Sequence, residues 1–255
     1  MGTVEIRCYG ELNDFLPPLR RQRAFPHSFS VPGSVKDALE SAGIPHPEID
    51  LLLVNGEPAG FARLLAAGDR VAAYPRFRCL DVSGISPVHV PPPAEPRFLL
   101  DGHLGRLARH LRLLGFDATH QAQADDTTLA AAAAAGDRIL LTRDLDLLKR
   151  AVVRRGYRVR STDPWEQTVE VVRQFDLIAR LDPFTRCLPC GDLLVPIPAA
   201  EAAGRVPPGV AVRHHDYRQC RACGRLYWAG SHQRRLAALV DRVQEVAAGH
   251  SSADG

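Results

Sequence analysis

The sequence lacks both a membrane-spanning stretch and a secretory leader. No apolar run approaches the roughly 20 residues that a membrane helix needs, and the chain does not open on a basic stretch followed by an apolar core. These absences argue against membrane insertion and secretion, so we expect a cytoplasmic protein. The 255 residues are enough for two or three compact domains, and the 45% hydrophobic and 24% charged content is ordinary for globular proteins.

Lysine is scarce and the excess of positive charge is small. Lysine occurs only at Lys36 and Lys149, so nearly all positive charge is arginine, and the net charge is +3. A charge of this size does not by itself indicate a nucleic-acid partner, so any basic surface must be local. Seven arginines, one acid and three aromatic residues share residues 203–235. Such a mixture can bind single-stranded nucleic acid, although Tyr227 and Trp228 can instead cover a small metal-site core.

The first eighty residues have the pattern of a small β-rich domain. Asn55-Gly56 is a strong signal for a two-residue hairpin, and Ser34 and Gly43 bound a short helix. This β-β-α-β-β order resembles the ubiquitin-like β-grasp fold of the small sulfur carriers (ThiS/MoaD-like). Those carriers end in Gly-Gly, whereas here the last strand runs on into Pro75, which argues against sulfur transfer and favours a docking role, with a protein partner, or a packing role. We expect strands over residues 3–8, 27–31, 49–54 and 69–74, and a helix over 35–41.

Composition changes divide the chain into five parts. Five prolines between residues 86 and 96 mark an extended spacer. Beyond it, strands alternate with helices that end in glycine, which indicates parallel β-α-β units. In that region we expect strands over 97–100, 117–120, 138–142 and 157–160, and a last helix over 145–155. The expected parts are a β-grasp domain at 1–82, a proline-rich linker at 83–96, an α/β domain at 97–181, a cysteine-bearing module at 182–235, and a C-terminal helix with a disordered tail at 236–255.

Acidic residues follow three successive strands of the α/β domain. Asp101 follows the first strand, Asp125 and Asp126 follow the second, and Asp144 and Asp146 follow the third. Because the β-to-α loops of a parallel sheet emerge at one edge, we expect these carboxylates to gather there. Such crowding is unfavourable unless cations neutralise it, and carboxylates suit Mg²⁺ or Mn²⁺. A divalent metal at that edge can activate water for phosphodiester hydrolysis.

Helix capping is the competing explanation for these acids. Asp125, Asp126 and Asp144 all stand where a helix N-cap is wanted, and capping alone accounts for an aspartate there. Asp101 shows no obvious capping need, because it ends an apolar strand and precedes a glycine. It also lacks the neighbouring acid expected of response regulators and of haloacid-dehalogenase-type phosphatases. The joint occurrence on three successive loops favours a metal site.

Longer motifs link the chain to a known family. FLLDGHLGRLARHLRLLGFD (98–117), ADD (124–126) and ILLTRDLD (139–146) closely resemble the Mut-seven C-terminal RNase family of PIN-like nucleases. PFTRCLPC (183–190), RVPP (205–208) and YWAGSH (227–232) match its zinc-ribbon tail, and an amino-terminal ubiquitin-like module also resembles a known arrangement of this family. The resemblance implies a PIN-like active site in which Asp101, Asp126, Asp144 and Asp146 hold the metal, with Asp125 as the alternative ligand from its loop.

Two arginines stand beside this expected site. Arg106 lies in the first helix of the α/β domain and Arg143 precedes Asp144, so both can hold phosphates by bidentate contacts. Arg109 and Arg112 lie on the same side of that helix, but an ordinary solvated face accounts for them equally well. We therefore assign substrate binding to Arg106 and Arg143.

The cysteines include two close pairs. Each C-x-x-C pair, Cys187/Cys190 and Cys220/Cys223, can supply two thiolates, and together they complete a closed tetrahedral zinc site. The separation between the pairs exceeds the common spacing, so a loop or hairpin must be inserted. Four cysteine ligands leave no open position for a substrate, so we expect this zinc to be structural.

Taken with the acids, these features favour metal-dependent hydrolysis of RNA phosphodiester bonds. We expect catalytic Mg²⁺ or Mn²⁺, structural Zn²⁺, an RNA substrate and no membrane partner. The alternative is a non-catalytic adaptor that binds RNA or protein on a PIN-like scaffold. None of the expected acids is missing from the sequence, which favours the nuclease.

Overall fold

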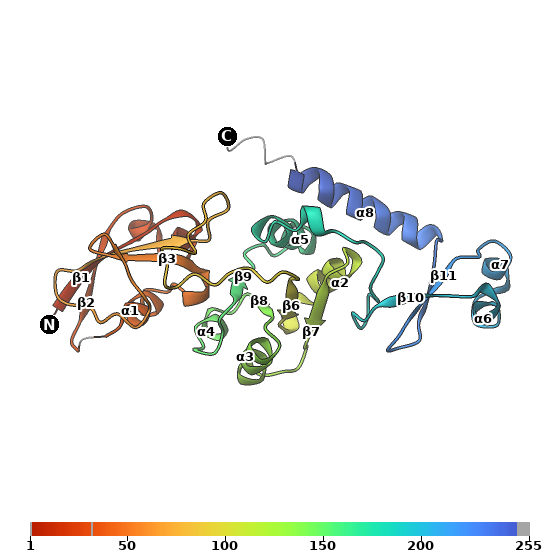
Figure 1. Cartoon of the computed structure of the whole chain (residues 1–255), viewed down its shortest axis with the longest axis horizontal. Coiled ribbons are helices and arrows are strands. Elements are labelled where there is room, and N and C mark those ends of the chain that lie inside the picture. Colours follow the sequence, from red (N-terminus) through yellow and green to blue (C-terminus); the bar gives the residue numbers. More distant parts are fainter. Residues whose placement is uncertain (1, 32, 249–255) are drawn as a thin grey trace. The chain divides into compact units, whose positions relative to one another are not determined.

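The computed structural model describes residues 2–31 and 33–248 (Figure 1). The disordered tail was predicted for the end of the chain, and residues 249–255 of it lie outside the described residues. No helix in the described part of the chain is long and apolar enough to cross a bilayer. The chain forms two compact units, Met1–Ala94 with Asp125–Arg158, and Glu95–Ala124 with Val159–Gly255.

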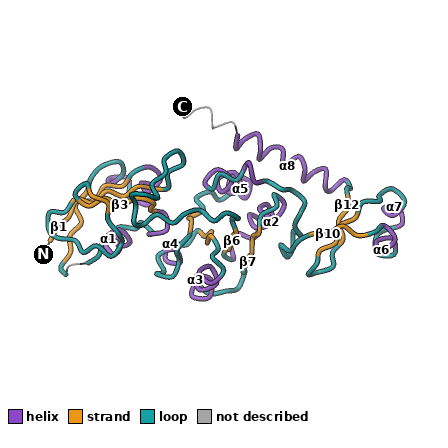
Figure 2. The backbone as a smooth tube through the Cα atoms, viewed as in Figure 1, coloured by secondary structure: helices purple, strands orange, loops and turns teal. Residues whose placement is uncertain are grey.

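The first unit opens with a five-stranded sheet in the order β2-β1-β5-β3-β4. Figure 2 shows strands of this sheet in orange, with β1 and β3 labelled. The central pair, β1 and β5, is parallel, and the flanking strands are antiparallel. This is the β-grasp arrangement that the sequence predicts, with β4 as an additional strand. The elements are β1 (Gly2–Cys8), η1 (Gly10–Phe15), η2 (Pro18–Arg20), β2 (Phe25–Phe29), α1 (Val35–Ser41), η3 (His46–Glu48), β3 (Ile49–Val54), β4 (Glu57–Pro58) and β5 (Arg70–Pro75).

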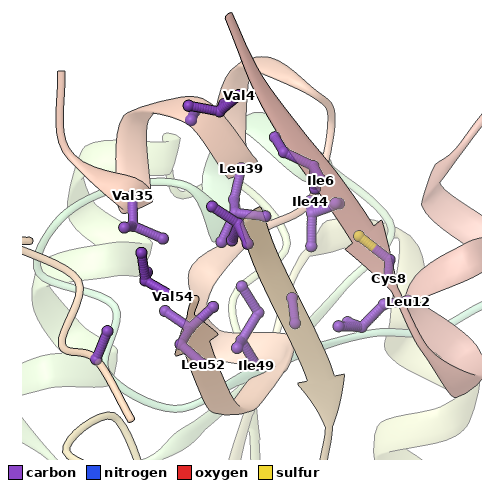
Figure 3. Close-up of a cluster of buried hydrophobic side chains, with 14 of the residues drawn as sticks. Val4, Ile6, Cys8, Leu12, Val35, Leu39, Ile44, Ile49, Leu52 and Val54 are labelled. Atoms are coloured by element: carbon purple, nitrogen blue, oxygen red, sulfur yellow. The ribbon is translucent and has the colours of Figure 1, made fainter. Parts of the chain in front are cut away.

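Local sequence explains these elements. Asn55 and Gly56 adopt positive φ angles of 57° and 93°, as a two-residue type I′ turn requires, so β3 and β4 form the predicted hairpin. Ser34 caps α1 in a reciprocal capping box with Asp37. Alternate residues of β1 point inward and meet those of α1 and β3 in one hydrophobic core (Figure 3).

The start of the proline-rich segment packs on this domain. Val88 belongs to the β-grasp core. The Ser86 hydroxyl donates to the carbonyl oxygen of Asp50 at 2.7 Å, and His89 Nδ1 lies 2.7 Å from Asp50 Oδ1. The first half of the predicted spacer thus folds with the β-grasp domain.

The second half of the predicted α/β domain belongs to the same unit as the β-grasp domain. Within it, β8 and β9 pair in parallel. His46 Nε2 lies 2.8 Å from the carbonyl oxygen of Val153, and the Arg158 amide donates to Glu48 Oε1 at 2.6 Å. His46 and Glu48 are both buried, so these are interior contacts. The elements here are α3 (Asp126–Ala135), β8 (Ile139–Thr142), α4 (Leu145–Leu148) and β9 (Gly156–Arg158).

The second unit holds the first half of the α/β domain. Strands β6 and β7 pair in parallel, and α2 joins them with its leucine face buried. Helix α2 packs on α5, where His110 Nδ1 lies 2.8 Å from Thr168 Oγ1. The elements are β6 (Arg97–Leu100), η4 (Gly102–Leu104), α2 (Gly105–Leu113), β7 (Asp117–His120), α5 (Pro164–Gln174) and η5 (Ile178–Arg180). The parallel pairs in both units confirm the predicted α/β class.

The cysteine-bearing module also lies in the second unit. Its three strands form an antiparallel sheet in the order β10-β11-β12. Two small cores support it: Tyr227 packs on one that contains Cys187 and Cys220, and Trp228 packs on one that contains Tyr217. Both aromatic residues therefore cover small cores, as one interpretation of the sequence held. The elements are β10 (Leu194–Ile197), α6 (Ala199–Ala203), α7 (Pro208–Ala211), β11 (Tyr217–Cys220), β12 (Leu226–Trp228) and α8 (Ser231–Ala248).

One predicted helix is wrong in length. The helix expected over residues 145–155 ends at Leu148. The β-branched Val152 and Val153 disfavour helix, and the Val153 amide instead closes a turn on the Arg150 carbonyl at 2.9 Å. The carbonyl of Val153 then faces His46, a contact that no local pattern could reveal.

Candidate functional site

The four paired cysteines converge in the second unit. Their Sγ atoms all lie within 4.8 Å of one another, with Cys187 and Cys223 3.6 Å apart and Cys190 and Cys220 3.3 Å apart. Four thiolates around one zinc at about 2.3 Å would lie roughly 3.8 Å apart. The donor set and its spacing therefore fit one tetrahedral zinc, as predicted.

Ionisation of this cluster depends on the groups around each sulfur. The Tyr227 hydroxyl lies 3.1 Å from Cys187 Sγ and accepts a hydrogen bond from the Leu188 amide. Burial opposes ionisation of Cys187, but the hydrogen bonds from Tyr227 and from neighbouring groups bring its pKa down to about 7. Burial raises the pKa of Cys190 to about 12. Four crowded sulfurs cannot all ionise unless a metal ion balances their charge.

Arg112 ties this cluster to the nuclease-like half of the unit. Its side chain is buried, with only 6% exposed, so of the two interpretations left open for Arg112, the solvated face is wrong. Its Nε donates to the Ala118 carbonyl at 2.7 Å, and its Nη1 donates to the carbonyls of Leu188 at 3.0 Å and Pro189 at 2.7 Å. Leu188 and Pro189 are the two residues between the first pair of cysteines. The guanidinium thus joins α2, β7 and the metal knuckle.

Asp101 lies in the same unit, directly after β6. Its carboxylate caps the short η4 turn by accepting from the His103 amide at 3.0 Å, so the expectation that it has no capping role is wrong. Yet Asp101 is also buried, with 6% exposed. Buried carboxylates are rare because the charge loses its hydration, which makes a buried one at the end of a strand a candidate functional group.

Asp125 and Asp126 open α3 in the other unit. Asp125 is the N-cap and accepts from the Thr128 amide at 2.8 Å, which is the main reason that its pKa lies below the ordinary range. Asp126 is the first helical residue and lies 3.7 Å from the Arg150 guanidinium. Asp126 thus already has a cationic partner, whereas the oxygens of Asp125 serve the helix.

Asp144 and Asp146 open α4. Asp144 caps this helix through the amides of Asp146 and Leu147. Its own amide donates to the hydroxyl of Thr142 at 2.9 Å, which fixes the turn after β8. The Asp146 side chain is 92% exposed and pairs weakly with Lys149 at 3.9 Å.

The five aspartates thus belong to two compact units, and each is described within its own. Among the residues that the structure describes, the four cysteines are the one group of three or more His, Cys, Asp or Glu side chains close enough to hold a metal ion. Arg106 and Arg143, the proposed phosphate contacts, are both exposed. A carboxylate site for Mg²⁺ or Mn²⁺ is accordingly a proposal, developed below.

Comparison with known proteins identifies the family. The family model described as Mut7-C RNAse domain matches residues 96–240, which is more than half of the chain. The chain belongs to the Mut7-C RNase family. A second model, described as Mut7-C ubiquitin, matches residues 1–81. The recognition made from the sequence motifs is confirmed, and nuclease-type function follows at the level of the family.

Solved structures show a weaker likeness. The crystal structure of SAMP1 from Haloferax volcanii is 24% identical, with 30% of this Mut7-C chain and 97% of that chain covered and a TM-score of 0.25. The crystal structure of small archaeal modifier protein 1 from H. volcanii is 23% identical, with 30% and 100% covered and a TM-score of 0.25. No curated protein matches this chain.

Two residues of the Mut7-C domain escaped sequence reasoning. Thr142 is fully buried at the end of β8 and holds the Asp144 amide. A threonine that interrupts an apolar strand just before an acidic loop was the available signal. Arg112 gave no signal, because its helical position matches that of exposed arginines.

Proposed function

We propose that this Mut7-C protein is a metal-dependent ribonuclease that hydrolyses RNA phosphodiester bonds. The observation that carries the proposal is Asp101, a buried carboxylate at the carboxyl end of a parallel strand inside the matched RNase domain. In parallel α/β folds, functional groups gather at that edge of the sheet. When bound, Mg²⁺ or Mn²⁺ would activate water and stabilise the departing oxygen.

The protein's own residues have distinct roles in this proposal. Asp101, Asp126, Asp144 and Asp146 supply carboxylate oxygens, with Asp125 as the alternative from the loop before α3. Asp126 lies 3.7 Å from the Arg150 guanidinium, so a metal ion at this position would take the place of an existing cationic partner. Thr142 is a positioning residue, because it holds the turn that carries Asp144.

Arg106 and Arg143 are assigned to the substrate. Both are exposed arginines in the segments that carry the proposed metal ligands. The planar guanidinium can contact a phosphate through two parallel hydrogen bonds, which would orient the strand for cleavage. We further propose a cytoplasmic location, Zn²⁺ in the cysteine site and a protein partner for the ubiquitin-like domain.

A mutational experiment tests the active-site assignment. We would measure cleavage of labelled RNA and DNA by the full chain, with and without Mn²⁺, for Asp101→Asn and Asp144→Asn. Asparagine caps a helix about as well as aspartate but removes the charge, so cleavage should fall by at least about 100-fold while folding survives. Asp163→Asn is the matched control, because Asp163 caps α5 in the same way but is not assigned to the site.

The adaptor is the second candidate, and a specific observation favours it. Asp101, Asp125 and Asp144 each cap a helix or turn, so capping accounts for part of their presence. An adaptor would bind RNA but leave it intact. Cleavage by both aspartate variants at the wild-type rate, with unchanged Mn²⁺ affinity, would refute the active-site assignment. Binding of RNA by the wild-type chain without any cleavage would favour the adaptor.

A further inference from the structure

A groove of about 880 Å³ lies within the second unit, away from the aspartate that carries the proposed function. Its walls come from the end of α2, the chain entering the cysteine module, the β10-β11-β12 sheet and the start of α8; these elements can be followed in Figure 1. Its volume falls in the range of roughly 300–1,000 Å³ that is usual for ligand-binding clefts. The groove is therefore large enough for a short polymer segment.

One row of side chains crosses the sheet along this groove. The strand register places Pro196 beside Arg218, and Arg218 beside Tyr227. All three line the groove, and Arg218 is exposed. Tyr227 is held in place by its hydroxyl contact with Cys187, so its ring is a fixed surface. A fixed ring beside a guanidinium offers flat faces on which bases can stack.

The groove also carries an uncompensated positive charge. Arg109 of α2, Arg218 of β11 and Arg225 just before β12 all line it, and all are exposed. Within the described chain, none of the three guanidinium groups is held by a hydrogen bond or an ion pair. Asp216 is the one acid among the lining residues. Charge complementarity therefore selects an anionic occupant.

We infer that this groove binds a single-stranded RNA segment, with phosphates on the three arginines and bases against Tyr227 and its neighbours. The choice of RNA over another anionic polymer rests on the proposed ribonuclease function. The mixed chemistry also favours RNA over an acidic peptide, because a peptide would meet the charges but would leave the flat aromatic surface without stacking partners. The groove would hold substrate beyond the cleaved bond.

Binding can be measured separately from cleavage. The probe is a fluorescein-labelled oligouridylate of about 12 nucleotides, followed by anisotropy with the full zinc-loaded chain and no added Mg²⁺ or Mn²⁺. In single strands each phosphate contact contributes about 0.7 to the slope of log affinity against log salt. Arg218→Ala/Arg225→Ala should therefore lower the slope by about 1.4 and weaken binding roughly 25-fold at 0.1 M salt.

The matched control removes the same charge from the same module. Arg213 and Arg221 are exposed but do not line the groove, so Arg213→Ala/Arg221→Ala should weaken binding less than about threefold. Zinc content and melting temperature must match wild type for both variants. Should the groove variant fold poorly, Arg109→Ala on α2 provides the test, with an expected fivefold loss and a slope change of about 0.7.

A spectroscopic signal reports on the groove directly. The chain has two tryptophans, and Trp228 lines the groove. Trp165→Phe leaves Trp228 as the reporter, and its fluorescence should be quenched as oligouridylate is added, but not as duplex RNA of equal length is added.

Four results would overturn the inference: equal losses for groove and control variants, no change in Trp228 fluorescence, cleavage whose KM is unchanged by the groove variants, or competition by polyglutamate as strong as that by RNA. The last would identify the site as one for acidic peptides. Absence of cleavage alongside the expected binding pattern would refute the ribonuclease but not the groove. Cleavage whose KM is unchanged by the groove variants would refute the groove but not the ribonuclease.

Discussion

Replacing the buried Arg112 by methionine should destabilise the second unit and loosen the zinc proposed for its cysteine site. Methionine has similar length but donates no hydrogen bonds, so the carbonyls of Ala118, Leu188 and Pro189 lose their donors. The hydrogen bonds to Ala118 and Leu188 are buried, and each abandoned carbonyl there costs about 1–3 kcal/mol. Relief from burying a charge offsets part of that cost.

The net loss in the free energy of unfolding should be about 2–4 kcal/mol. For a chain of this size, each kcal/mol lowers the melting temperature by roughly 2–4 °C, so the transition of this unit should fall by roughly 5–15 °C. Zinc should also dissociate faster, because Leu188 and Pro189 separate the first two cysteine ligands and would no longer be anchored to α2.

Circular dichroism melting and zinc release to a chromogenic chelator would measure the two effects on the full chain. Arg109→Met is the matched control, since Arg109 is an exposed arginine one turn away on the same helix. A surface change of this kind usually shifts stability by less than about 0.5 kcal/mol. If Arg112→Met and Arg109→Met gave equal melting temperatures and equal zinc release, the proposed anchoring would be refuted.

Four further predictions follow from individual contacts. Burial lowers the pKa of His110, so the folded state resists the proton that the unfolded chain takes up. The free energy of unfolding should therefore fall as pH drops below about 6.5. His110→Asn should flatten this pH dependence in melting curves. Gly191→Ala should destabilise the fold of the cysteine module, because Gly191 has φ +86° and an added Cβ would lie 3.0 Å from Arg112 Nε. An unchanged rate of zinc release would contradict this prediction. Chelating zinc should unfold the chain beyond about residue 182, which hydrogen exchange would detect. Elemental analysis that finds no zinc in the purified protein would refute this prediction. A protein starting at Pro91 should keep its RNA cleavage activity but melt at a lower temperature, because the Val153 carbonyl loses its buried partner His46. Total loss of activity in a folded truncation would show that the β-grasp domain completes the site.

The sequence predicted most of the elements, because the signals involved are local. Asn55-Gly56 predicted the β3–β4 hairpin, since only residues tolerant of positive φ fit that turn. Ser34 predicted the start of α1, and the C-x-x-C spacing predicted the thiolate cluster, since each pair forms its own knuckle. The five aspartates were selected in the same way, as residues that follow strands, and their role as metal ligands stays a prediction.

The sequence by itself thus determined most of the secondary structure, the family and the four cysteines that cluster. Tertiary structure alone decided that Arg112 is buried and that His46 and Glu48 meet Val153 and Arg158, more than 100 residues away. The physical reason is that turns, caps and knuckles are set by neighbours in the chain, whereas burial and long-range hydrogen bonds depend on which segments the folded chain brings together.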